Sequence, residues 1–138
     1  MKNVITVSTE VRGSIKSVWE SWTLPEHIVH WNFADDSWHA PAALNDLRVG
    51  GKFSYRMEAK DGSEGFDFSG VYTEIVALKV IAYTMDDGRT ARVTFEENGD
   101  STIVTEVFEA EQMNPVEMQQ AGWQMILDNF KRYTESLG

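Results

Sequence analysis

The aromatic residues are the most numerous side chains in this sequence that could form a binding site. Trp, Tyr and Phe make up 12% of the chain, and five of them are Trp. Such side chains line apolar sites because they offer large rigid surfaces and, in Trp and Tyr, one polar atom. The composition therefore favours binding of a small apolar molecule, and a bulky core with no internal space is the alternative.

Ionisable residues in predicted strands are the second set of candidate functional residues. Asp67, Arg92 and Glu106 lie in segments that read as strands. A carboxyl group buried beside a cavity can act as a general acid or base with a shifted pKa, whereas on a solvated face it has no such role. The sequence has no nucleophile elbow, phosphate-binding loop or dinucleotide fingerprint. We therefore assign no catalytic residue, and an enzyme acting on a hydrophobic substrate is a less favoured alternative.

Histidines and aspartates between positions 27 and 39 are the third set of candidate functional residues. They are His27, His30, Asp35, Asp36 and His39. Two histidines three residues apart in a helix, with a carboxylate nearby, are of the types that hold zinc. Their spacing matches no closed metal motif, so the sequence predicts neither a metal site nor a cofactor.

Charge and composition exclude several classes of function. The net charge is −10, which disfavours a nucleic-acid partner because such proteins use basic surfaces to displace counterions from phosphates. The sequence has no Cys, which excludes disulfides and thiolate metal ligands. It also has neither an apolar run long enough to span a membrane nor a secretory signal, so we expect a cytoplasmic protein.

Apolar periodicity and turn residues predict the elements that must position these side chains. The expected order is a strand over 3–11, helices over 14–22 and 26–31, an irregular segment over 32–45 with a short strand near 40–44, strands over 52–59, 66–77, 78–85, 89–96 and 101–109, and a helix over 115–136.

Local signals place the ends and irregularities of these elements. Ser14 is expected to cap the first helix, and Thr23 to cap the second, with Pro25 in its first turn. Asn114 is expected to cap the last helix. The apolar residues before and after Gly70 fall on opposite faces of their strand, which predicts a bulge or bend at that glycine.

Together these elements predict one α+β domain over residues 1–138. Its antiparallel sheet has about six or seven strands, with two short helices after the first strand. The last helix spans roughly 30 Å, enough to cross a small sheet. Because a long helix over a strongly curved sheet leaves space between them, the pattern predicts an apolar cavity.

Four segments carry a resemblance to a known family. The chain resembles the START-like superfamily (SRPBCC, Bet v 1-like), and within it the activator of heat-shock-protein-90 ATPase homologue, C-terminal-like family. The residues that carry the resemblance are Val18-Trp19 with Thr23-Leu24-Pro25-Glu26 and Trp31, then Asp46 to Phe53, then Gly70 to Ile75, and finally Gly122-Trp123.

The resemblance implies a helix-grip fold with a hydrophobic cavity. It also implies an alternative function, as a protein-interaction module related to heat-shock chaperone ATPase activators with a role in the stress response. Binding of a small hydrophobic or amphipathic molecule between sheet and last helix is the leading hypothesis. A protein partner, and a homodimer through the sheet edge or the Trp-rich loop, are compatible with the sequence.

The expected ligand-binding residues follow from strand and helix faces. The sheet is expected to supply one wall, the last helix a lid, and the segment after the second helix the mouth. The wall residues are Phe53, Tyr55, Met57, Phe66, Phe68 and Tyr72; the lid residues are Trp123, Leu127 and Phe130; and the mouth residues are Trp31 and Trp38.

Overall fold

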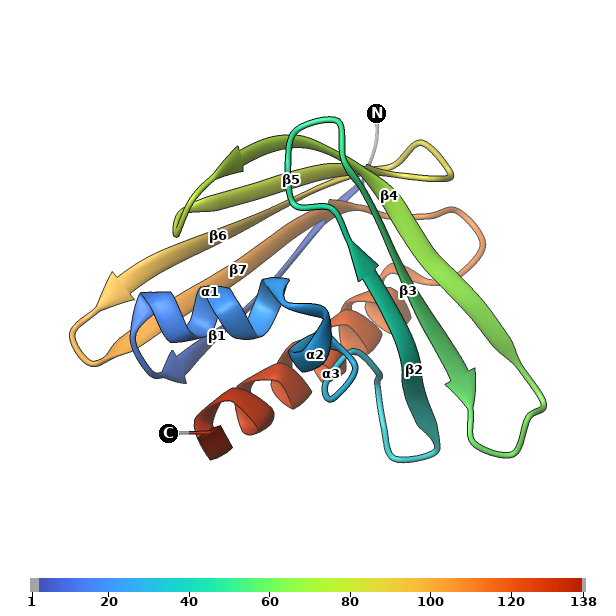
Figure 1. The fold of residues 1–138 in the computed structure, drawn as a ribbon. Helices are drawn as coiled ribbons and strands as arrows, with labels where there is room; N and C mark the ends of the chain where they lie inside the picture. Colours follow the sequence, from blue (N-terminus) through green and yellow to red (C-terminus); the bar gives the residue numbers. More distant parts are fainter. Residues whose placement is uncertain (1–2, 138) are drawn as a thin grey trace.

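The main architectural element is a sheet of seven antiparallel strands in the order β1-β7-β6-β5-β4-β3-β2. The computed structural model describes residues 3–137, and Figure 1 shows their arrangement. In chain order the elements are β1 (Val4–Arg12), α1 (Ile15–Thr23), α2 (Pro25–Ile28), β2 (Trp38–Asn45), β3 (Lys52–Ala59), β4 (Gly65–Val76), β5 (Val80–Met85), β6 (Thr90–Asn98), β7 (Ser101–Glu109) and α3 (Val116–Leu137).

The sheet is curled, and α3 lies across it with α1 and α2 nearby (Figure 1). Strands β2 to β7 form successive antiparallel hairpins, whereas β1 pairs with β7. This arrangement confirms the predicted α+β helix-grip fold. Among residues 3–137, no helix has the length and apolar character needed to cross a membrane.

The first strand and helix form largely as predicted. Ile5, Val7 and Val11 are buried on one side of β1. The Ser14 hydroxyl accepts a hydrogen bond from the Ser17 backbone N–H at 3.1 Å, so Ser14 is the N-cap of α1.

The junction between α1 and α2 differs from the prediction. Thr23 does not cap α2. It is the last residue of α1, and its hydroxyl donates to the Trp19 carbonyl at 2.9 Å. A threonine near a helix end can bond back to the preceding turn, and here that bond uses the hydroxyl expected at the cap. Helix α2 also ends at Ile28, earlier than expected.

Strand β2 is longer than the sequence indicated. The segment expected to be mostly irregular forms a strand from Trp38 to Asn45, with a shift in register between His39 and Ala42. Pro41 lies inside that shift. Because β2 is at the edge of the sheet, a residue without a backbone N–H is tolerated there.

The predicted irregularity at Gly70 is misplaced. Gly70 stays in register with Phe53 on β3 and Met85 on β5, and the shift occurs between Tyr72 and Glu74. The change of inward face therefore comes just after Tyr72. Gly70 has a different role, because a Cβ atom there would lie 2.5 Å from the Thr84 carbonyl oxygen.

We expect opposite effects from alanine at two glycines. Gly70→Ala should lower the free energy of unfolding by roughly 1–3 kcal/mol, because the added carbon meets the Thr84 backbone and the Phe53 ring. Gly122→Ala, in α3 with open space around it, should raise that energy by about 0.5–1 kcal/mol, since alanine favours the helix. Urea denaturation measures both. A neutral result for Gly70→Ala would contradict the close approach.

Candidate functional site

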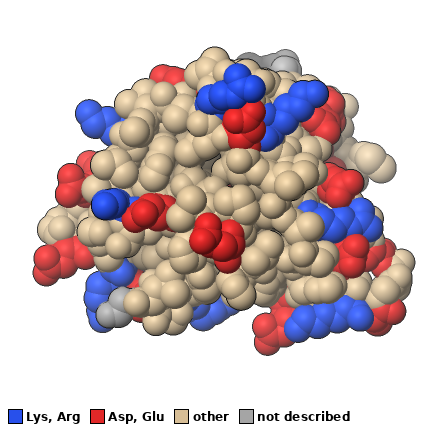
Figure 2. All heavy atoms as spheres, in the orientation of Figure 1, with Lys and Arg blue, Asp and Glu red and all other residues tan. Residues whose placement is uncertain are grey.

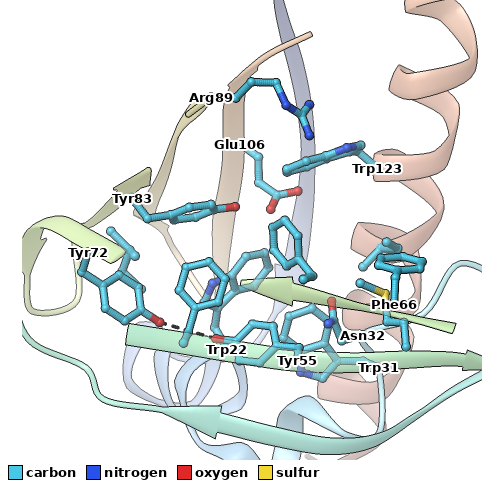
Figure 3. A pocket seen from close by; sticks show the side chains of 15 residues that line it. Trp22, Trp31, Asn32, Tyr55, Phe66, Tyr72, Tyr83, Arg89, Glu106 and Trp123 are labelled. Atoms are coloured by element: carbon cyan, nitrogen blue, oxygen red, sulfur yellow. Dashed lines mark hydrogen bonds between the residues drawn. The ribbon is translucent and has the colours of Figure 1, made fainter. Parts of the chain in front are cut away.

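A cavity of about 230 Å³ lies between the sheet and the helices. Figure 3 shows it from close by, with side chains from several elements pointing toward one space. Its lining residues are Trp22, Trp31, Asn32, Phe53, Tyr55, Met57, Phe66, Phe68, Tyr72, Ile81, Tyr83, Arg89, Glu106, Trp123 and Ile126. An apolar cavity of about 150 Å³ can hold benzene, so this one has room for a larger molecule.

The sheet side of the cavity is an aromatic cluster centred on Phe53. The Phe53 ring centre lies 4.9 Å from that of Tyr83, 5.3 Å from that of Tyr72 and 5.5 Å from that of Phe68. Alternation along β3, β4 and β5 places these rings on one face, because successive side chains of a strand point to opposite sides. Rings packed at these distances and angles form a stable wall.

Trp22 and Trp31 form the side of the cavity next to α1 and α2. Their ring centres are 4.9 Å apart, and each packs edge-on against Phe130 of α3. The Trp31 indole N–H donates to the Ser21 carbonyl at 2.9 Å. This bond satisfies the polar atom of Trp31, so the ring presents an apolar surface to the cavity.

Trp123 closes the cavity from α3. Its ring stacks on Phe108 of β7, with centres 3.6 Å apart, and meets Phe68 edge-on at 6.0 Å. The long helix therefore holds one aromatic ring against both halves of the curled sheet.

Two tyrosine hydroxyls at the β3–β4 side are held by a polar chain. The Tyr55 and Tyr72 hydroxyl oxygens are 3.5 Å apart, and Tyr72 donates to the Asn45 side-chain carbonyl. The Asn45 amide in turn donates to the Thr23 carbonyl at 2.7 Å. Burial raises the pKa of Tyr72 to about 12, and that of Tyr55 also lies well above its ordinary range, so both stay protonated.

Glu106 is the buried carboxylic acid of the cavity. It is 6% exposed and extends from β7 into the space beside Tyr83 and Trp123 (Figure 3). No hydrogen bond within residues 3–137 reaches its carboxyl group, and burial alone raises its pKa to about 8. At neutral pH the group is therefore mostly uncharged and can donate a hydrogen bond or a proton to a molecule in the cavity.

Tyr83 and Arg89 lie on either side of Glu106. Burial, reinforced by the Glu106 charge, raises the pKa of Tyr83 well above its ordinary range. The Arg89 guanidinium is already paired, since Nε lies 2.7 Å from the Asp87 carboxylate and Nη1 donates to the Glu109 carbonyl at 3.2 Å. Its positive charge is thus largely balanced outside the cavity.

Asn32 contributes an amide with no partner. The residue is 5% exposed, and its Nδ2 is buried without a hydrogen-bond partner among the described residues. Its side chain lies at the cavity, on the side of Trp31 and away from Glu106 (Figure 3). An unpaired buried amide costs roughly 1–3 kcal/mol, so such groups in a native fold call for an explanation.

The structure brings most of the predicted site residues together. The predicted residues that line the cavity are Trp31, Phe53, Tyr55, Met57, Phe66, Phe68, Tyr72 and Trp123. Three others lie elsewhere. Trp38 packs against Phe66, with ring centres 5.9 Å apart, and does not line the cavity. Leu127 and Phe130 are buried in the core, and Trp22 and Trp31 stand between Phe130 and the cavity.

Several lining residues were not among the predicted ligand-binding residues. They are Trp22, Asn32, Ile81, Tyr83, Arg89, Glu106 and Ile126. Ile81 and Tyr83 share a face of β5 with Met85, and all three are buried, so strand alternation could have found them. Asn32 gives no such signal, because it follows a helix that ends in an irregular segment.

The other ionisable candidates lie outside the cavity. Asp67 pairs with Arg56 at 3.5 Å on the outer face of the sheet, and Arg92 pairs with Glu74 there. Of the three strand residues considered for acid–base chemistry, Glu106 alone faces the cavity.

The histidine and aspartate segment does not converge on one point. His27 Nδ1 is 2.6 Å from the Tyr133 hydroxyl, and the His30 ring stacks on Tyr133. Asp35 accepts hydrogen bonds from Ser37, whereas His39 Nε2 lies 3.6 Å from Glu58. Within residues 3–137, no group of three or more potential ligands is arranged to hold a metal ion.

The surface around these elements carries charges of both signs. On the face in Figure 2, Lys and Arg are interspersed with Asp and Glu and form no continuous basic area. Ion pairs such as Arg48 with Asp46 and Lys131 with Glu135 contribute to this mixture. Exposed pairs of this kind add little to stability.

Solved structures with similar folds come from several bacteria. The AHSA1-like protein of Aeromonas hydrophila is 45% identical, with a TM-score of 0.89 over 97% of this chain and 94% of that one. A protein of Cytophaga hutchinsonii is 49% identical, with a TM-score of 0.83 over 96% and 92%. One from Chromobacterium violaceum, 23% identical with a TM-score of 0.85 over 96% and 98%, shares the fold.

The sequence comparison agrees with the structural one. No curated protein matches the chain. Residues 12–135 match the family described as "Activator of Hsp90 ATPase homolog 1-like protein". The match spans α1 to α3, and so includes every element that lines the cavity. The chain therefore belongs to this family of the START-like superfamily.

Proposed function

We propose that this protein binds a small hydrophobic or amphipathic molecule in the cavity between the sheet and α3. The observation that carries the proposal is the aromatic lining of a space of about 230 Å³. Transfer of apolar surface from water into such a space contributes about 25 cal/mol per Å². The wall is held by ring packing and by the Tyr72–Asn45 hydrogen bond, so little of that gain is lost to ordering the site.

A thermal-shift screen against fatty acids, sterols, flavonoids and aromatic polyketides tests the proposal. A bound compound at about 100 times its dissociation constant should add about 2.7 kcal/mol, which corresponds to a shift of several degrees. Trp22, Trp31 and Trp123 line the cavity, so the same compound should also quench tryptophan fluorescence. A saturable shift with quenching supports the proposal, and a flat response across the panel counts against it.

Phe68→Asp is expected to abolish the shift. The substitution places a charge in the apolar wall, where an unpaired carboxylate is strongly disfavoured beside a bound apolar molecule. Val76→Asp is the matched control, because Val76 is an exposed residue at the far end of the same strand. The control should respond to ligand as the wild type does. Unchanged binding by a folded Phe68→Asp variant would contradict the assignment of this wall.

A protein-interaction role is the second candidate. The family description names an activator of the Hsp90 ATPase, and methionines are exposed on and just before α3: Met113 at 91%, Met118 at 62% and Met125 at 42%. Met118 and Met125 are seven residues apart and so lie on one side of the helix. Flexible methionines suit adaptable protein contacts. Measuring ATP hydrolysis by Hsp90 with and without this protein separates the two candidates.

A further inference from the structure

Three polar side chains face the cavity with unused hydrogen-bonding capacity. The Glu106 carboxyl group and the Tyr83 hydroxyl make no hydrogen bond within residues 3–137, and the Asn32 amide nitrogen is buried without a partner. They come from β7, β5 and the segment after α2, and the rest of the lining is mostly aromatic or aliphatic, with Tyr55, Tyr72 and Arg89 as its further polar side chains. Figure 3 shows them on different sides of the same space.

Buried polar groups in native proteins are nearly always paired with protein, water or ligand. Two other polar groups at this site follow the rule, since Tyr72 donates to Asn45 and the Trp31 N–H donates to Ser21. At this cavity the unpaired side chains are ones that a ligand could reach, whereas the other buried atom without a partner among the described residues, Thr134 Oγ1, lies away from it.

We propose that the cavity selects uncharged ring compounds that carry a carbonyl-type oxygen. This oxygen accepts a hydrogen bond from the Glu106 carboxyl group, and the Asn32 amide can donate to a second oxygen of the ligand. This inference rests on the proposed function and specifies the chemistry of the ligand.

The charges around Glu106 favour a neutral ligand over an ionic one. The titratable groups that face it are Tyr83 from β5 and Arg89 from the turn before β6, and α3 contributes the uncharged ring of Trp123. Arg89 is paired with Asp87, so it is not free to balance an anionic ligand. A cationic ligand would require Glu106 to ionise in an apolar environment that raises its pKa to about 8.

A neutral carboxyl group is a hydrogen-bond donor, as are the Tyr83 hydroxyl and the Asn32 amide. A ligand that supplies acceptor oxygens satisfies these groups. A pure hydrocarbon would leave them unpaired and would lose the corresponding free energy.

Three compounds with one ring skeleton test the inference on the intact protein: 1-tetralone, tetralin and 1-aminotetralin. Binding is followed by tryptophan quenching and calorimetry at pH 6. We expect 1-tetralone to bind about fivefold to tenfold more tightly than tetralin, the ratio that one net hydrogen bond supplies. The charged amine should bind most weakly.

Two variants at one position show whether Glu106 is the donor. Glu106→Leu should bring the affinity for 1-tetralone down to that for tetralin and leave tetralin unaffected or slightly improved. Glu106→Gln keeps an N–H donor of similar size, so it should retain most of the preference for the ketone. The comparison of the three compounds on the wild type stands even if a variant fails to fold.

The outcomes separate the two proposals. Equal binding of 1-tetralone and tetralin, or tightest binding of the amine, would overturn the inference while leaving a ligand-binding cavity in place. A ketone preference that persists in Glu106→Leu would assign the donor elsewhere and also overturn it. Failure of all three compounds to bind would count against the proposed function itself, and the inference would fall with it.

Discussion

Replacing Glu106 with glutamine should remove a large pH dependence from the stability of this protein. Burial raises the pKa of Glu106 from an ordinary 4.5 to about 8 in the folded state. Between these values the folded chain keeps the proton and the unfolded chain has lost it. Because the unfolded state then binds fewer protons, the free energy of unfolding falls as pH rises through this window.

The expected size of this effect is large. Each pH unit in the window corresponds to about 1.4 kcal/mol, so the whole window corresponds to roughly 5 kcal/mol. Near pH 4.5 the wild type and Glu106→Gln should be similarly stable, and above pH 8 the variant should be more stable by several kcal/mol. Urea denaturation at a series of pH values measures the difference.

Glu96→Gln provides the control for charge removal. Glu96 is an exposed residue on the neighbouring strand β6. In the Glu96→Gln variant, the free energy of unfolding should therefore change with pH in parallel with that of the wild type. If the free energy of unfolding of Glu106→Gln also changed with pH in parallel with that of the wild type, the cavity carboxyl would ionise in its ordinary range. The interior at β7 would then be more hydrated than the structure indicates.

Phe130→Ala is expected to cost about 3–5 kcal/mol of stability, the usual result of truncating a fully buried aromatic ring. Phe130 is 0% exposed, and its ring centre lies 4.9 Å from Trp22 and 4.8 Å from Trp31. Removing it takes away the support behind one side of the cavity. Denaturation in urea, with near-ultraviolet circular dichroism to follow the tryptophans, measures the loss.

Met125→Ala on the same helix is the matched control. Met125 is 42% exposed, and its truncation should change stability by no more than about 0.5 kcal/mol. A loss of less than about 1 kcal/mol for Phe130→Ala would contradict its place in the core. It would favour instead the lid position that the sequence suggested.

Alternation and capping predicted the elements that have one apolar face and clear boundaries. Strand β3 is buried at Phe53, Tyr55 and Met57, and α1 begins after Ser14. Strand β2 was predicted too short, near 40–44, because Asp35-Asp36 and Pro41 favour a loop, whereas it runs from Trp38 to Asn45. Whether a proline is tolerated in a strand depends on whether that strand lies at the sheet edge, and a local pattern does not contain this information.

The bulge in β4 shows a similar limit. The apolar residues indicated a change of face along the strand, but its position is set by pairing with β5, where Glu74 rather than Thr73 lies opposite Ala82. Gly70 attracted the prediction because glycines are common at bulges. Its actual role, close approach to the Thr84 backbone, depends on a neighbouring strand and could not be seen in the sequence.

The aromatic wall could be predicted from strand faces, but the polar groups of the cavity could not. Glu106 was a candidate, yet β7 carries apolar residues on both faces, with Val104 buried and Val107 exposed, so its direction stayed ambiguous. Phe130 was assigned correctly to the inward side of α3. It misses the cavity because Trp22 and Trp31, from another part of the chain, lie in between.

The pairing of β1 with β7 has a consequence for how the molecule is assembled. Val4 lies opposite Glu109, so this part of the sheet joins segments about a hundred residues apart, whereas the other strands join through short hairpins. Closing such a long loop carries an entropic cost that local hairpins avoid. Since α3 packs mainly on β1, the cavity can be enclosed only after nearly the whole chain has been synthesised.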